Sequence, residues 1–158
     1  MSDYEAFLQG KKHLAGNFGF DPIWIPDGTF DFQRHIIEWA IRKGRAAIFA
    51  DTGLGKTLLQ LIIAENIIRK TNGRVLILTP LAVAFQFIKE AQRIGVGDIA
   101  YCKDGKLTTK IVVTNYERLR HFNSEDYEAV ILDESSILKN NEGEIKTQVT
   151  NFMRKVKY

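Results

Sequence analysis

The stretch that decides the fold is residues 46–70, AAIFADTGLGKTLLQLIIAENIIRK. Its first five residues are apolar and predict a short buried strand, and residues 56–70 have the length and apolar content of a helix. Between them, Gly53 and Gly55 let the backbone curl so that its N–H groups point inward, directly before the start of the helix. A turn of this kind is a nest for phosphate oxygens, reinforced by the helix N-terminus.

This turn also carries the side chains that a bound nucleotide needs. Lys56 is placed to reach the β- and γ-phosphates, and the Thr57 hydroxyl to bind Mg²⁺. The strict phosphate-loop pattern has a glycine where this chain has Ala50, so a plain strand-to-helix turn is the alternative. A dinucleotide-binding turn is disfavoured because Leu58 stands where a third small residue is needed. The residues expected to bind nucleotide here are Thr52, Gly53, Leu54, Gly55, Lys56 and Thr57.

The rest of the chain repeats the alternation of apolar runs and helical patterns. Apolar runs without polar alternation are typical of strands buried on both faces, and helices between them predict a parallel sheet covered on both sides. Residues 1–30, rich in Gly, Pro and aromatic residues, predict a short helix at 3–8 and an irregular strap against the domain formed by residues 31–158. The expected strands are 46–50, 75–78, 99–102, 111–113 and 129–132, and the expected helices are 31–43 (N-capped by Asp31), 56–70, 81–95, 115–120 and 142–155.

Two acidic residues follow the last expected strand. Ligands bind beyond the carboxyl ends of the strands in such sheets, which is where Asp133 and Glu134 are expected. We assign Asp133 to Mg²⁺ and Glu134 to activation of a water for attack on the γ-phosphate. The alternative is a solvated acidic turn.

Residues 50–57, ADTGLGKT, followed by residues 133–140, DESSILKN, resemble motifs I and II of superfamily 2 helicases and translocases. The second motif looks most like the Swi/Snf-type branch. The resemblance covers about residues 30–140 and implies an α/β fold of the RecA-like P-loop NTPase type, a three-layer α/β/α arrangement with a mostly parallel sheet. It also implies ATP hydrolysis with Mg²⁺, in which Lys56, Asp133 and Glu134 are catalytic.

Three weaker motifs fit the same family in order. Gln33 resembles the glutamine of the Q-motif, whose amide matches the adenine edge. Thr79-Pro80 resembles motif Ia and Thr114-Asn115 resembles motif Ib, where nucleic-acid backbone is held without reading sequence. A surface glutamine, a strand-ending proline and ordinary core packing are the alternatives.

In this family ATP is hydrolysed between two RecA-like domains, and the present chain resembles the first. We therefore expect a fragment of a longer motor, with slow hydrolysis in isolation because a second RecA-like domain supplies arginines to the transition state. The Swi/Snf likeness favours double-stranded DNA as partner, with RNA left open. A regulatory nucleotide-binding module without hydrolysis and a small phosphotransferase are the competing functions.

Composition sets the remaining limits. The net charge is +3, with 22 basic and 19 acidic residues, which permits a polyanionic partner without demanding one. A single cysteine excludes an internal disulfide, and no apolar stretch is long enough to span a bilayer. The acidic N-terminus lacks the apolar core of a secretion signal, so we expect a cytoplasmic or nucleoid-associated protein without membrane contact.

Overall fold

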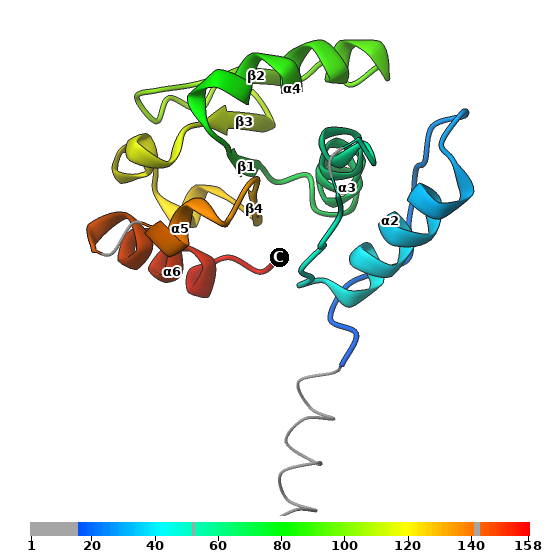
Figure 1. The fold of residues 1–158 in the computed structure, drawn as a ribbon, viewed down its shortest axis with the longest axis horizontal. Helices are drawn as coiled ribbons and strands as arrows, with labels where there is room; N and C mark the ends of the chain where they lie inside the picture. Colours follow the sequence, from blue (N-terminus) through cyan, green and yellow to red (C-terminus); the bar gives the residue numbers. More distant parts are fainter. Residues whose placement is uncertain (1–15, 52, 141–142) are drawn as a thin grey trace, which may run out of the picture.

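The computed structural model describes residues 16–51, 53–140 and 143–158 (Figure 1). The short helix expected at residues 3–8 and the candidate ligand Thr52 lie outside this part of the chain. The helices are α2 (Asp31–Lys43), α3 (Lys56–Thr71), α4 (Leu81–Arg93), α5 (Ile137–Asn140) and α6 (Glu144–Lys155), the 3₁₀ helices are η1 (Tyr116–His121) and η2 (Ser124–Asp126), and the strands are β1 (Val75–Leu78), β2 (Ile99–Tyr101), β3 (Ile111–Thr114) and β4 (Ala129–Leu132).

The four strands form one parallel sheet in the order β2-β3-β1-β4. In the central strand, Val75 is paired with Ile111 on one side and with Ala129 on the other. All four residues of β1 are fully buried, as expected for a strand covered on both faces. The sequence-based prediction of a parallel sheet is confirmed; the inner strands β1 and β3 are buried throughout, whereas the edge strands β2 and β4 are buried only at their first residue and half-buried beyond it.

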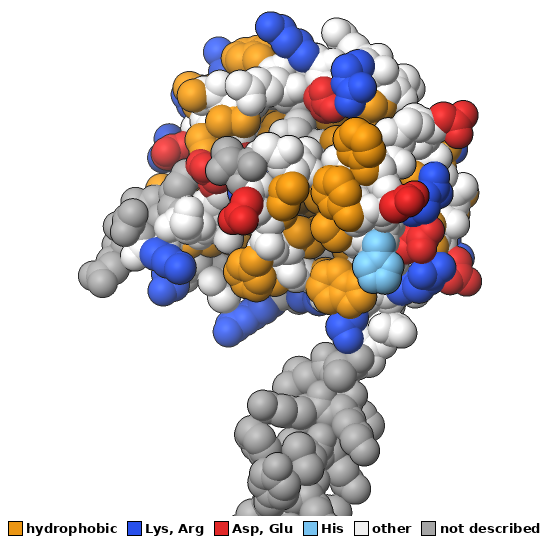
Figure 2. Space-filling model, turned by 45° about the vertical axis from the view of Figure 1, so that its right-hand side comes forward, with side chains coloured by type: hydrophobic (Ala, Val, Ile, Leu, Met, Phe, Trp, Pro, Cys, Tyr) orange, Lys and Arg blue, Asp and Glu red, His pale blue; other side chains and the backbone are white. Residues whose placement is uncertain are grey.

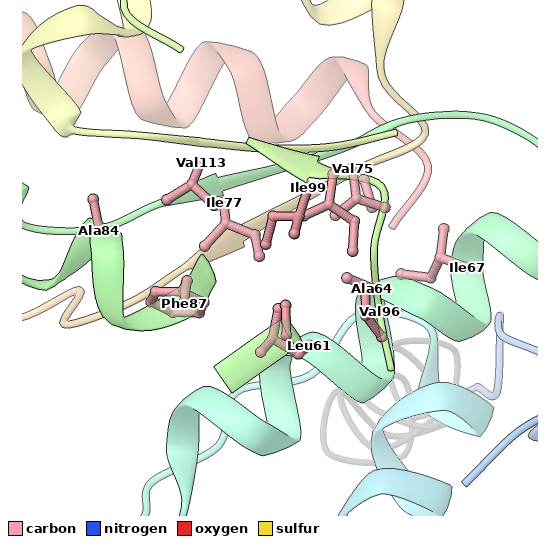
Figure 3. Close-up of a cluster of buried hydrophobic side chains, with 13 residues drawn as sticks. Leu61, Ala64, Ile67, Val75, Ile77, Ala84, Phe87, Val96, Ile99 and Val113 are labelled. Atoms are coloured by element: carbon pink, nitrogen blue, oxygen red, sulfur yellow. The ribbon is translucent and has the colours of Figure 1, made fainter. Parts of the chain in front are cut away.

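Alternate residues of the strands enter two different cores, because successive side chains of a strand point to opposite faces. Val75 and Ile77 pack with α3 and α4 (Figure 3), whereas Leu76 packs with η1 and α6. Helix α2 adds a further layer outside α3, where Ile37 and Ile41 contact α3 residues (Figure 1). Among the described helices, none is long and apolar enough to cross a membrane.

The segment 46–50 is not a strand, so this prediction is wrong. A strand needs a neighbour, and the edge of β4 that faces away from β1 is occupied at its start by the end of the chain: the Lys157 and Tyr158 amides donate to the Glu128 carbonyl, and the Val130 amide donates to the Tyr158 carbonyl. The Arg45 side chain donates to the Val156 and Lys157 carbonyls. Because Arg45 is held against residues 156 and 157, segment 46–50 starts outside the β4 edge and pairs with no strand of the sheet. Its residue Phe49 is 97% exposed.

The described part of the strap, residues 16–30, is tied to the helices by hydrogen bonds. The backbone amides of residues 18–20 donate to carbonyls at the end of α2. Further along, the fully buried Asn66 of α3 accepts from the Ile23 and Trp24 amides at 2.7 and 2.9 Å and donates to the Trp24 carbonyl at 2.7 Å. A polar side chain in the core is thus satisfied by strap backbone, and this fixes where the strap docks.

Candidate nucleotide site

The glycine-rich turn has the backbone that its sequence predicts. Gly53 and Gly55 have φ values of +88° and +79°, a region that L-residues other than glycine rarely adopt. Helix α3 begins at Lys56, and the first intrahelical bond of this end joins the Leu59 amide to the Gly55 carbonyl at 3.0 Å. The amides of Lys56, Thr57 and Leu58 precede this bond and lack intrahelical acceptors, so they can bind an anion.

Lys56 occupies an electrostatically unfavourable position. It is half-buried at the first residue of α3, where the helix dipole is positive, and the first turn has no acidic residue. By contrast, α2 and α6 carry Asp31 and Glu144 in their first turns. Within the described part of the chain, the Lys56 side chain makes no hydrogen bond or ion pair. A bound polyanion would stabilise both the lysine and the helix terminus.

Asp133 lies at the carboxyl end of β4 and is 8% exposed. Its Oδ1 accepts from Gln60 Nε2 at 2.9 Å, and its Oδ2 accepts from the Thr79 hydroxyl at 2.8 Å. Its backbone carbonyl accepts from the Tyr116 hydroxyl at 2.6 Å. Gln60 is one helical turn after Lys56, so this contact brings the start of α3 and the end of β4 side by side.

Glu134, the second acidic residue, is exposed and has a φ of +50°. A non-glycine residue in this region costs on the order of 1 kcal/mol, and such strain is found disproportionately at functional sites. Burial, and then the charges of Asp133 and Glu134, raise the pKa of the Tyr116 hydroxyl above its ordinary value. Tyr116 therefore keeps its proton and remains a donor to the Asp133 carbonyl across the physiological pH range.

Gln33 lies against the glycine-rich turn. It is 5% exposed, its Oε1 accepts from the Phe30 amide at 3.2 Å, and its Nε2 donates to the Leu54 carbonyl at 3.2 Å. Each of these amide atoms retains one further hydrogen-bonding capacity for a ligand. The N-cap of α2 is Phe30 and not Asp31, so the predicted cap is wrong. The Gln33 side chain, rather than an Asp31 cap, accepts the hydrogen bond of the Phe30 amide at this end of α2.

Figure 2 shows the face of the molecule that includes α2, with apolar side chains exposed near its centre. Phe30, Phe32 and Trp39 are 66%, 46% and 44% exposed. The Phe30 and Phe32 rings stack with their centroids 6.0 Å apart and their planes 9° from parallel. Since both phenylalanines lie within three residues before Gln33, which contacts the Leu54 carbonyl, an exposed aromatic surface lies close to the glycine-rich turn.

The residues expected to contact nucleic acid lie at the carboxyl ends of β1 and β3, at the same edge of the sheet as Asp133; Thr114 is the last residue of β3, and the others follow their strands. Thr79 and Thr114 are fully buried, and the Thr79 hydroxyl is bound to Asp133. The Asn115 side chain is 7% exposed, accepts from the Tyr101 hydroxyl and donates to a glutamate, while Pro80 is half-buried. A contact from these positions would therefore come from backbone groups rather than from the hydroxyls.

The oxygen ligands at this edge suit Mg²⁺. Thr57 and Asp133 supply hard oxygens, and Gln60 Oε1, beside Asp133, is buried with no hydrogen-bond partner in the structure. Elsewhere too, the described residues contain no group of three His, Cys, Asp or Glu side chains that could hold a metal by themselves.

Comparison with known families agrees with this geometry. The sequence model described as DEAD/DEAH box helicase matches residues 30–157. The chain belongs to this helicase family. A curated relative, the uncharacterized ATP-dependent helicase YqhH of Bacillus subtilis (strain 168), is 27% identical over 146 residues, which are 85% of this chain and 26% of YqhH. This helicase domain thus spans about a quarter of that relative.

Solved helicase structures share the fold of the domain. The SWI2/SNF2 ATPase core of Sulfolobus solfataricus in complex with dsDNA matches with a TM-score of 0.68 and 20% identity, over 87% of this chain and 32% of the other. The UvsW helicase from bacteriophage T4 matches with a TM-score of 0.67 and 14% identity, over 99% of this chain and 58% of the other. The RecA-like helicase fold is therefore confirmed. Membership of the helicase family implies that this domain binds ATP and belongs to an ATPase.

Proposed function

We propose that this helicase domain is the ATP-binding motor domain of a superfamily 2 helicase or double-stranded DNA translocase, which couples ATP hydrolysis to movement on nucleic acid. The observation that carries the proposal is the contact of Gln60 with Asp133. It sets a buried carboxylate beside a helix N-terminus whose lysine has no partner among the described residues. A triphosphate would neutralise the Lys56 ammonium and the helix N-terminus, and its metal ion would neutralise the Asp133 carboxylate.

Each side chain of the site then has one role. Lys56 and the free amides at the start of α3 bind the phosphates, and Gly53 and Gly55 shape the turn. Thr52, proposed as a further nucleotide ligand, lies outside the described residues. Thr57 and Asp133 hold Mg²⁺, which neutralises phosphate charge when bound. Glu134, exposed at the strand end, orients and deprotonates the attacking water.

The base is proposed to lie near α2. Gln33 has one free donor and one free acceptor, a pair that matches the adenine edge. The exposed rings of Phe30 and Phe32 offer an apolar surface against which a base can stack. The backbone of Leu54, which Gln33 contacts, joins this surface to the phosphate-binding turn.

The nucleic-acid partner is proposed to be double-stranded DNA, with RNA as the alternative. The loops that contain Thr79-Pro80 and Thr114-Asn115 lie at one edge of the sheet and can bind phosphates through backbone groups. The solved SWI2/SNF2 core that shares this fold is itself bound to dsDNA. We further propose that a second RecA-like domain completes the catalytic site, that the domain alone hydrolyses ATP slowly, and that the protein works in the cytoplasm or on the nucleoid.

The test compares Lys56→Ala with Glu134→Gln in the full-length protein, using a fluorescent ATP analogue for binding and phosphate release for turnover. Lys56→Ala should abolish binding, whereas Glu134→Gln should retain binding and lose about 10²–10⁴-fold in turnover. Phosphate release should rise when DNA is added to the unsubstituted protein. Turnover unchanged by Glu134→Gln would refute the motor assignment and favour the regulatory module, and transfer of phosphate to an acceptor other than water would favour the phosphotransferase.

A further inference from the structure

We propose that Gln60 and Thr79 are positioning residues for the metal that accompanies the nucleotide: they fix the Asp133 carboxylate from two sides, and Gln60 accepts a hydrogen bond from water bound to that metal. The inference rests on the proposed function, because it concerns the same nucleotide site. Neither residue had this role in the sequence-based assignment, which gave Thr79 to nucleic acid and gave Gln60 no role.

The first observation is that both carboxylate oxygens of Asp133 are held. Gln60 Nε2 binds Oδ1 at 2.9 Å, and the Thr79 hydroxyl binds Oδ2 at 2.8 Å. The two donors come from α3 and from the end of β1, so the carboxylate plane is fixed by two separate elements. Each carboxylate oxygen can accept more than one hydrogen bond, so these donors leave capacity for a metal-bound water.

The second observation is the state of the Gln60 amide. Its nitrogen is used on Asp133, while its Oε1 is buried and makes no hydrogen bond in the structure. Leaving a buried acceptor unsatisfied costs on the order of 1–3 kcal/mol, so a protein rarely keeps one without reason. A carboxamide oxygen next to a carboxylate is suited to accept from water coordinated to Mg²⁺, because this ion keeps much of its hydration shell.

The third observation is the burial of the Thr79 side chain. Thr79 is fully buried, so its hydroxyl cannot reach a nucleic-acid phosphate, and Asp133 is its partner. Outer-shell partners of this kind orient the first-shell ligands, and their removal typically lowers metal affinity about 10–100-fold. Thr79 and Gln60 should therefore control how strongly the metal increases nucleotide binding, without contacting the nucleotide.

The test measures binding of a fluorescent, non-hydrolysable ATP analogue to the 158-residue chain, in EDTA and in excess Mg²⁺. The ratio of the two dissociation constants gives the metal enhancement, and Mn²⁺ binding to the chain with the same analogue, followed by electron paramagnetic resonance, gives a direct second readout. Thr79→Val and Gln60→Leu should each reduce the enhancement about tenfold or more and weaken Mn²⁺ binding in proportion, with the EDTA value unchanged.

Two controls separate positioning from folding. Thr79→Ser keeps the hydroxyl and should retain the enhancement. Gln148→Leu removes a half-buried glutamine of α6 that likewise donates to a carboxylate, at 3.0 Å to Glu144, and it should change neither readout. The thermal midpoint of every variant is measured alongside, and if one of the two test variants does not fold, the other decides.

The outcomes are distinguishable. A lower thermal midpoint with an unchanged metal enhancement in Thr79→Val and Gln60→Leu would overturn the positioning role and leave the proposed function intact. Equal weakening of binding in EDTA and in Mg²⁺ would also overturn it, because the side chains would then shape the nucleotide pocket rather than the metal site. No binding by the unsubstituted chain under either condition would count against the proposed nucleotide function itself.

Discussion

Gly55→Ala is the most informative single change in the glycine-rich turn, because two separate physical penalties meet there. The left-handed backbone at Gly55 (φ +79°) costs an alanine about 1–2 kcal/mol. In addition, an alanine Cβ would lie 2.6 Å from Gln33 Nε2, so Gln33 would have to move and lose its bond to the Leu54 carbonyl. That hydrogen bond contributes about 1 kcal/mol.

Together these penalties predict a loss of about 2–3 kcal/mol in the free energy of unfolding for Gly55→Ala, or a fall of about 5–10 °C in the thermal midpoint. Gly53→Ala is the matched control: its φ is +88°, but its added Cβ meets no atom within 4 Å. It should lose only the backbone penalty of about 1–2 kcal/mol. The smaller entropy of the unfolded chain favours alanine equally in both variants and cancels in the comparison.

The assay is urea unfolding of five proteins: the unsubstituted chain, Gly53→Ala, Gly55→Ala, Gln33→Ala and the double variant Gln33→Ala/Gly55→Ala. Without the Gln33 amide, Gly55→Ala should cost no more than Gly53→Ala, which gives a coupling energy of about 1 kcal/mol between the two positions. If Gly55→Ala and Gly53→Ala are equally destabilising in the unsubstituted background, the close approach of Gln33 to the turn is refuted. A zero coupling energy would refute it as well.

Three further predictions follow from the same structure. Lys56→Met should abolish nucleotide binding. In urea unfolding without nucleotide it should raise the free energy of unfolding by about 0.3–1 kcal/mol, because it removes a positive charge from the positive end of the α3 dipole. A marked loss of stability would instead show that the Lys56 ammonium has a partner in the folded chain. Asn66→Ala should cost about 2–3 kcal/mol and remove hydrogen-exchange protection from the strap amides that it holds, whereas unchanged protection would mean that the strap is docked by other contacts. The pKa of Tyr116 is raised in the folded chain, so the contribution of Tyr116 to the free energy of unfolding should be constant below about pH 10, the ordinary tyrosine pKa, and should fall above it as Tyr116 ionises in the unfolded chain. Tyr116→Phe should reduce the slope of the free energy of unfolding against pH by up to about 1.4 kcal/mol per pH unit. An unchanged slope would contradict the raised pKa.

The strands of the sheet could be predicted from the sequence where helices cover both faces, because such strands consist of continuous apolar residues. The runs 75–78, 111–113 and 129–132 are apolar at every position because helices cover both faces of the sheet, and all three lie in strands. Helix α3 was equally clear, since glycines precede it and Asn72-Gly73 follows it. These features depend on local sequence, and local sequence was sufficient to place them.

Segment 46–50 shows where local sequence stops being sufficient. Its composition resembles that of β1, yet β1 is paired with a strand on each side and segment 46–50 is not part of the sheet. Whether an apolar run becomes a strand depends on which backbone lies beside it, and here Lys157 and Tyr158, more than 100 residues away, hold the start of the β4 edge. A pattern of five residues contains no information about that distant pairing.

The role of Thr79 was missed for a related reason, and it changes how the site has to be understood. Thr79 and Asp133 are 54 residues apart and meet because Leu78 and Leu132, which precede them, are paired across β1 and β4. Thr79 is followed directly in the chain by Pro80, which belongs to the same loop proposed to contact nucleic acid and is the N-cap of α4. If Asp133 released Thr79, the fully buried Thr79 hydroxyl would lose its partner, at a cost of about 1–3 kcal/mol. The hydrogen bond between Thr79 and Asp133 thus ties the proposed metal ligand to the residue that directly precedes the N-cap of α4.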